Sequence, residues 1–221
     1  MVYDHYGGRD RFPGVSEELM RAVDQADSAR YSLDEVLHPQ GWTLLNFLMD
    51  SRTGLGRFRD FRISNYQLMM QLIDACSRLD VEEILQLPDV RERVELYHAQ
   101  SEQFVEQLRR CTSVRGTIAV VDLRPGDVIH AGNRFMVYAL FPEARVSVHV
   151  IWGRQKLNTV LAVGKSIIDR TSPTDIGAVM LRYGGGGHVA AGTCQVPHEE
   201  SERVIAEVVD AVGAPRHVTV P

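Results

Sequence analysis

The chain has 221 residues and a formal charge of −5, from 24 Lys and Arg against 29 Asp and Glu, and 44% of its residues are hydrophobic. This composition excludes a wholly disordered chain, and the length suits one large domain or two small ones. The acidic balance disfavours a general nucleic-acid coat or a polybasic membrane anchor, but it leaves room for a local basic pocket.

The three cysteines, Cys76, Cys111 and Cys194, are widely spaced and form no Cys-x-x-Cys pair. This spacing argues against a disulfide framework or a zinc knuckle. Residues 1–11 contain no apolar segment of the signal-peptide kind, and no apolar run approaches the roughly 18 residues of a membrane span. We therefore expect a cytoplasmic protein with reduced thiols and no membrane association.

The first half of the sequence has helical periodicity. Ser16 followed by Glu17 and Glu18 is typical of a helix start, because serine caps the first amides and acids favour that end of the helix dipole. Apolar spacing predicts a further helix over 64–76 and a long one over 88–111. We expect a helical part over 1–87, a connector helix over 88–112 and a second domain over 113–221.

The second half changes to the apolar runs and alternation that are typical of strands. Strands are predicted over 117–123, 134–141, 146–152 and 158–163. Ser172-Pro173-Thr174-Asp175 predicts a helix that Ser172 caps and that ends near Gly184, and a last helix is predicted over 199–212. The fold class is therefore α/β: a helical N-terminal part, joined by a long helix to a mixed β-sheet covered by helices.

The segment with the most specific chemistry is the glycine run at 184–187, which is followed by His188. Such a run offers unhindered main-chain amides and positive φ angles, which together can hold an anion such as phosphate, and His188 would add a donor. The alternative is a glycine-rich turn in which Gly184 ends a helix and His188 is merely hydrogen-bonded. The residues alone leave both interpretations open.

Two side chains outside the run are candidates for the same pocket. Arg182 could pair with phosphate through two parallel hydrogen bonds, or it could be a solvated charge at the end of a helix. Ser166 could line the pocket, or it could belong to a turn at the end of a strand.

Gly184-Gly185-Gly186-Gly187-His188, with Ala190-Ala191-Gly192 after it, resembles the glycine–histidine signature of the DHH phosphoesterase superfamily. The blocks 163–167 and 132–135 resemble its exopolyphosphatase-like branch. The signature belongs to the DHH-associated domain, which in that family binds substrate phosphates or a terminal nucleotide. The resemblance implies hydrolysis of phosphoanhydride or phosphodiester bonds. It also implies a phosphate-containing partner: a small molecule, a polyphosphate or a short oligonucleotide.

In that family an N-terminal DHH domain holds two Mn²⁺ or Mg²⁺ ions, which activate water and clamp the reacting oxygens. Here Asp27, in Ala26-Asp27-Ser28-Ala29-Arg30-Tyr31, resembles one aspartate ligand of the family, with Asp24 as its competitor or a solvated carboxylate as the alternative. Asp4-His5-Tyr6 resembles Asp-His-His with its last member replaced, or it is simply a helix end.

One carboxylate cannot organise two metals, so the resemblance leaves three hypotheses open. The chain is a phosphoesterase whose catalytic residues the sequence does not identify, a shortened member that binds phosphate or nucleotide without catalysis, or the product of an incomplete gene model that lacks the metal-binding half. Residues 1–87 would then be a remnant of the DHH domain. The apolar surface that a missing half-domain exposes would favour a homodimer.

Overall fold

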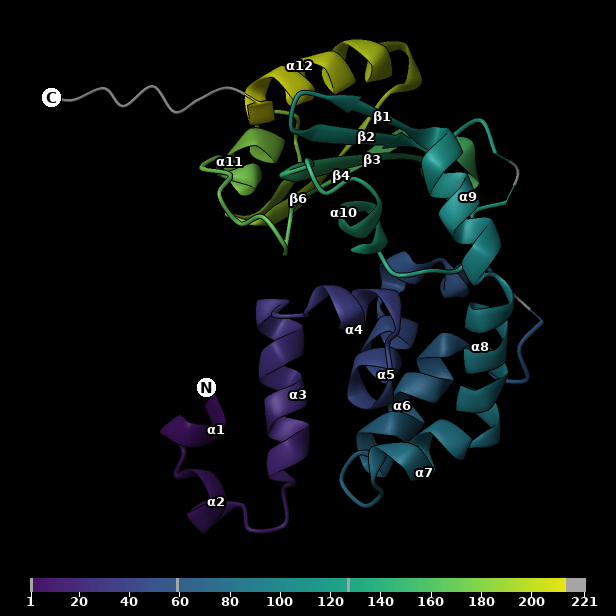
Figure 1. Cartoon of the computed structure of the whole chain (residues 1–221), viewed down its shortest axis with the longest axis vertical. Coiled ribbons are helices and arrows are strands. Elements are labelled where there is room, and N and C mark those ends of the chain that lie inside the picture. Colours follow the sequence, from purple (N-terminus) through teal and green to yellow (C-terminus); the bar gives the residue numbers. More distant parts are fainter. Residues whose placement is uncertain (1, 59, 127, 214–221) are drawn as a thin grey trace, which may run out of the picture. The chain divides into compact units, whose positions relative to one another are not determined.

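The computed structural model describes residues 2–58, 60–126 and 128–213 (Figure 1). Its contacts divide the chain into two compact units. The first comprises the chain up to Phe104 together with His130–Arg134, and the second comprises Val105–Ile129 and the chain from Phe135 onward. Within the described ranges, no helix is both long enough and apolar enough to cross a membrane.

The first unit, as far as the structure describes it, is built of helices. They are α1 (Val2–His5), α2 (Gly8–Arg11), α3 (Glu17–Ser28), α4 (Leu33–Leu37), α5 (Gly41–Met49), α6 (Asn65–Ala75), α7 (Val81–Gln86) and α8 (Pro88–Ala99), with two short 3₁₀ turns at Ser51–Thr53 and Leu55–Arg57. Helix α9 (Ser101–Cys111) runs from this unit into the second. The core of the first unit is formed by side chains of α5, α6, α7 and α8.

The helix expectations for this half are confirmed in part. Ser16 caps α3 by accepting a hydrogen bond from the Leu19 amide, and Ser64 caps α6 in the same way. The single helix expected over 88–111 is wrong, because Gln100 leaves the helical region and separates α8 from α9. The Gln100 side chain accepts a hydrogen bond from the amide of Ala131, a contact distant in sequence that periodicity cannot show.

The second unit contains a six-stranded sheet with the order β1-β2-β3-β4-β6-β5. Neighbouring strands are antiparallel except β2 and β3, which are parallel. The strands are β1 (Thr112–Arg115), β2 (Ile118–Asp122), β3 (Val146–Trp152), β4 (Thr159–Lys165), β5 (Gly186–His188) and β6 (Ala191–Val196), and the helices are α10 (Met136–Leu140), α11 (Ile176–Leu181) and α12 (Ser201–Gly213). This arrangement confirms the mixed sheet covered by helices.

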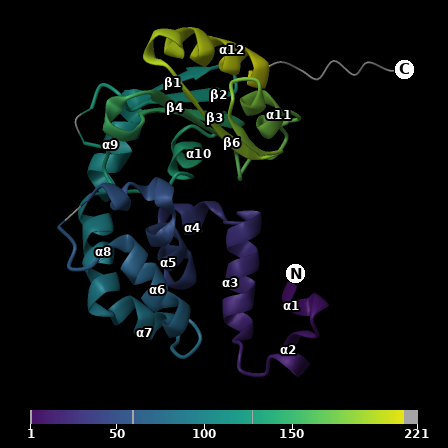
Figure 2. The same cartoon turned by 180° about the vertical axis from the view of Figure 1, so that it is seen from behind.

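The helices cover opposite faces of this sheet. Side chains of β2, β3, β4 and β6 pack with α11 and α12 in one apolar core. The other face carries α10, whose Tyr138 hydroxyl meets the hydroxyl of Ser147 at 2.8 Å and donates to the carbonyl of Gly164 at 2.7 Å. Figures 1 and 2 show α12 and α10 on opposite sides of the strands.

Two expectations for the second half are wrong. The strand expected over 134–141 is wrong: helix α10 (Met136–Leu140) lies there, in the connection between β2 and β3, because parallel neighbours need a crossover. Ser172 does not cap α11. The helix begins one turn later, where the carboxylate of Asp175 accepts a hydrogen bond from the amide of Ala178 at 3.0 Å.

Candidate functional site

The glycine run forms the end of α11 and the edge strand β5. Gly184 has a φ of +71° and stands just past the helix, and the amide of Gly185 donates back to the carbonyl of Met180. This is the helix ending that glycine favours, since a side chain is strained at positive φ. The amides of Gly184 and Gly185 are thus engaged within the protein, and anion binding by Gly186, Gly187 and His188 stays a prediction.

Three further glycines allow α11, β5 and β6 to approach closely. A Cβ atom at Gly177 would lie 2.8 Å from the carbonyl carbon and oxygen of Gly187. One at Gly185 would lie 2.1 Å from the carbonyl oxygen of Thr193, and one at Gly192 would lie 2.7 Å from that of Gly186. These contacts are shorter than side chains tolerate, so glycine at these positions is required by packing. A glycine inside a predicted helix, as at Gly177, indicates an unusual position, but the sequence does not show that the cause is the close approach of Gly187.

Gly186 and His188 differ from these positions, because both are exposed and their positions face the same side of the sheet. A Cβ atom at Gly186 would meet nothing within 4 Å. His188 pairs with Ala191, which is followed across the sheet by Gly164 and Ser147. Since Ser147 contacts α10, His188 lies on the face of the sheet that carries α10. Its neighbours in this row, Ala191 and Gly164, have small side chains or none.

The histidine ring is oriented by the hairpin itself. The amide of Ala190 donates to Nδ1 of His188 at 3.2 Å. Because Nδ1 accepts this hydrogen bond, the neutral ring carries its proton on Nε2. His188 therefore presents a donor to the solvent side of the hairpin, which suits an anionic oxygen.

Ser166 lies near the β5–β6 hairpin, but its side chain forms hydrogen bonds within the loop that follows β4. The amide of Lys165 donates to the carbonyl of Ala190 at 2.8 Å, which fixes the end of β4 beside the turn of the hairpin. The buried Oγ of Ser166 accepts hydrogen bonds from the amides of Ile168 and Asp169 at 3.1 and 3.0 Å. Ser166 therefore belongs to a turn at the end of a strand, which is one of the two interpretations that the sequence left open. A contact of Ser166 with substrate stays a prediction.

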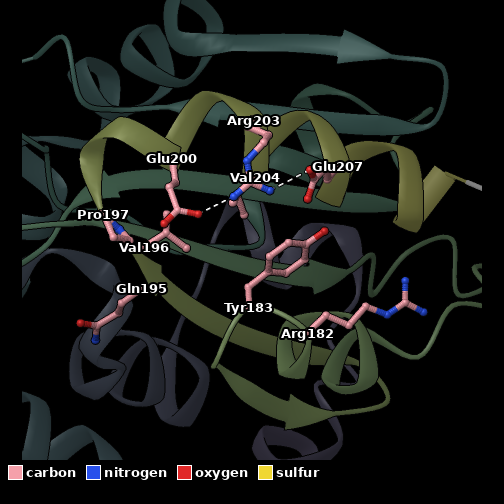
Figure 3. Close-up of a pocket in the computed structure, with 9 residues that line it drawn as sticks. All are labelled: Arg182, Tyr183, Gln195, Val196, Pro197, Glu200, Arg203, Val204 and Glu207. Atoms are coloured by element: carbon pink, nitrogen blue, oxygen red, sulfur yellow. Dashed lines mark hydrogen bonds and ion pairs between the residues drawn. The ribbon is translucent and has the colours of Figure 1, made fainter.

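Arg182 lines a cavity whose walls do not include His188. A cavity of about 510 Å³ lies between the end of α11, the end of β6 and α12 (Figure 3). Within it, Arg203 forms ion pairs with Glu200 and, at 2.8 Å, with Glu207. Among the described residues, the Arg182 guanidinium has no ion pair.

The ionisation states of two side chains that line this cavity follow from the directions of their pKa shifts. Burial raises the pKa of Tyr183, and its hydrogen bond to Glu207 raises it further, so the phenol stays neutral. The hydrogen bond from Arg203 lowers the pKa of the Glu207 carboxyl, which stays ionised. The lining of this cavity includes Arg182 but neither Ser166 nor His188, and a contact of Arg182 with substrate also remains a prediction.

A two-metal centre needs several carboxylates and imidazoles directed at one place. Across residues 2–58, 60–126 and 128–213, no three His, Cys, Asp or Glu side chains gather in that way. Asp27 is exposed on α3, Asp24 lies 3.9 Å from the guanidinium of Arg30, and Asp4 and His5 stand at the end of α1. These residues do not fit a metal pair, and Asp27 as a single ligand remains a prediction.

No protein-family model matches the sequence, and a search of curated proteins finds no match. Among solved structures, the chain is similar to the pGpG-specific phosphodiesterase PggH from Vibrio cholerae, with 54% sequence identity, a TM-score of 0.78 and coverage of 96% of this chain and 71% of that one. An exopolyphosphatase-related protein from Bacteroides fragilis matches with 13% identity and a TM-score of 0.43, over 66% of this chain and 42% of that one. A member of the S1p family of ribosomal proteins, described as a DHH domain, matches with 13% identity and a TM-score of 0.44, over 77% and 42%.

Proposed function

Because the chain belongs to the DHH phosphoesterase family, we propose that it provides the nucleotide-binding part of an oligonucleotide phosphodiesterase that acts on dinucleotides such as pGpG. The observation that carries this proposal is the 54% identity to a pGpG-specific phosphodiesterase over 96% of this chain. The hairpin of Gly186 and His188 supplies a matching chemistry, a donor and an open main chain for a phosphate oxygen.

The residues of this chain have a binding and orienting role in the proposal. The Nε2 proton of His188 donates to a phosphate oxygen, and the absent side chain of Gly186 lets the phosphate approach the strand. Gly164 and Ala191 are the small residues that follow His188 across the same face of the sheet. Phosphoesterases of this family depend on metal ions, which activate the attacking water when bound.

Calorimetric titration of the whole chain with pGpG tests this role directly. His188→Ala should weaken binding by about tenfold, the loss expected for one hydrogen bond to a charged oxygen. His98→Ala is the control: it removes an exposed imidazole from α8, in the first unit, and should leave the affinity for pGpG unchanged. Equal affinities of the two variants, or tighter binding of a short polyphosphate than of pGpG, would contradict the proposal.

A non-catalytic binding role is the second candidate, and the observation that favours it is the lack of a metal-ligand cluster among the described residues. Hydrolysis of pGpG consumes one water and yields two molecules of GMP, so chromatography separates the two roles. Incubation of the chain with pGpG and Mn²⁺ should leave the dinucleotide intact if the chain only binds. Stoichiometric appearance of GMP, lost in a His188→Ala variant, would instead assign catalysis to this chain.

A further inference from the structure

The cavity that Arg182 lines contains polar groups with unused hydrogen-bonding capacity. Arg203 of α12 forms one ion pair with Glu207 and one with Oε2 of Glu200, which lies in the turn before α12. Within the described ranges, Oε1 of Glu200 accepts no hydrogen bond, and the Arg182 guanidinium forms no ion pair. The cavity therefore offers a carboxylate oxygen and a cation to a ligand.

The size of the cavity and its remaining walls suit a ligand with a planar ring. Its volume of about 510 Å³ falls within the roughly 300–1,000 Å³ of cavities that hold small molecules. Pro197 contributes an apolar wall, and Tyr183 contributes an aromatic ring whose hydroxyl is held by Glu207. Figure 3 shows this ring between Glu200 and Arg182, so a ligand that reaches both charges passes the ring. Aromatic side chains placed in this way stack on nucleobases.

The two charges select the chemistry of the ligand. A carboxylate has about four lone-pair sites, so Glu200 can keep its ion pair with Arg203 and accept two further hydrogen bonds. Guanine is the standard base whose pairing edge carries two adjacent donors, N1–H and N2–H. Adenine and cytosine place a ring acceptor beside their amino group, and a carboxylate repels that acceptor. At the other end Arg182 requires an anionic group, and its planar guanidinium suits phosphate.

We propose that this cavity is a second nucleotide site, which binds guanosine monophosphate (GMP). The base donates to the Glu200 carboxylate and stacks on Tyr183, and the phosphate pairs with Arg182. Neither Gly186 nor His188 belongs to the lining, so the site is additional to the hairpin that the proposed function uses. The inference rests on the residues of the cavity alone and holds whether or not the chain acts on pGpG.

Calorimetric titration of the whole chain with GMP tests the phosphate end of the site. The titration uses a Gly186→Val background, in which a side chain blocks the main chain of the hairpin. A single molecule of GMP should still bind. Adding Arg182→Gln should weaken this binding by about tenfold or more, since hydrogen bonds to a charged phosphate are lost. Arg115→Gln is the control, because it removes an exposed guanidinium from β1 and should leave the affinity unchanged.

A second comparison in the same background tests the base end. GMP should bind more tightly than adenosine monophosphate (AMP) by about tenfold or more, because the two share the phosphate and differ in the donors of the base. Glu200→Gln should remove this preference, since its amide can turn an N–H donor toward the donors of guanine. Glu199→Gln should retain the preference, because Glu199 is exposed next to Glu200 but does not line the cavity.

Three results would overturn the proposal. The first is the absence of saturable GMP binding in the Gly186→Val background, and the second is equal affinity of the Arg182→Gln and Arg115→Gln variants for GMP. The third is binding of AMP or of inorganic phosphate as tight as that of GMP, which would leave only a general anion site. Because pGpG is absent from these assays, a failure here leaves the His188 titration to decide the proposed function by itself.

Discussion

Replacing Gly177 by alanine is expected to destabilise the protein, although alanine is the better helix former. Gly177 lies inside α11, where the change alone would stabilise the helix by up to about 1 kcal/mol. However, the new Cβ atom would stand 2.8 Å from the main chain of Gly187 and 3.0 Å from the amide nitrogen of His188. Main-chain atoms of a paired strand cannot rotate away, so α11 or β5 must shift.

The magnitude follows from the two opposing terms. Overpacking of a well-packed interior costs about 1–3 kcal/mol, and the gain in helix propensity of up to about 1 kcal/mol offsets part of it, which leaves a net loss of up to about 2 kcal/mol. For a chain of this size, that loss lowers the melting temperature by up to roughly 8 °C. The shift of β5 should also weaken pGpG binding, because His188 moves with the strand.

Gly186→Ala is the matched control for this experiment. Its Cβ atom would meet nothing within 4 Å, so the free energy of unfolding should change by less than about 0.5 kcal/mol. The two variants are compared by urea denaturation followed by circular dichroism, with the slope against denaturant checked for both. A Gly177→Ala variant as stable as the wild type, or a Gly186→Ala variant equally destabilised, would refute the close-packing explanation of the glycine run.

Two further predictions concern the first unit. Buried Arg93 donates to the main-chain carbonyls of Asp89 and Ile63. Arg93→Met should lower the free energy of unfolding, measured by urea denaturation, by about 3–5 kcal/mol. Arg91→Met, at an exposed site, is the control and should change it by less than about 0.5 kcal/mol. Burial raises the pKa of Tyr31 to about 12, so its contribution to stability is complete below about pH 10, where both states are neutral, and is lost as the pH rises toward 12. Between about pH 9 and 12, the free energy of unfolding should fall less steeply for Tyr31→Phe than for the wild type. Parallel curves for the two proteins would contradict the raised pKa of Tyr31.

Local chemistry explains the parts of the fold that the sequence predicted correctly. Ser16 caps its helix through a hydrogen bond from the amide three positions away, so a short window contains all the information for that helix start. Gly184 is likewise placed by the backbone angle that a helix end requires. The alternating residues of β3 predict a strand because its two faces differ, one packed on α12 and the other on α10.

The errors arise where a distant partner decides the conformation. Residues 134–141 are apolar enough for a strand, but the parallel pairing of β2 with β3 makes them a crossover, and that pairing is not visible in the segment itself. Gln100 interrupts the long helix without a glycine or proline to mark the break. For the candidate site, the roles of His188 and Arg182 stay predictions, whereas the cavity that Arg182 lines depends on how α11 packs against α12, which the sequence does not show.

The backbone angles and the space around each glycine show which positions of the run the fold requires to be glycine and which it does not. Gly184 is explained by its positive φ, and Gly185 and Gly187 by the atoms of β6 that a side chain would strike. Gly186 has an ordinary φ and open space around it, so neither strain nor packing requires glycine there. Because it faces the same side of the strand as His188, we propose that a ligand approaches the main chain at this position. Gly186→Val should therefore abolish pGpG binding while the chain remains folded.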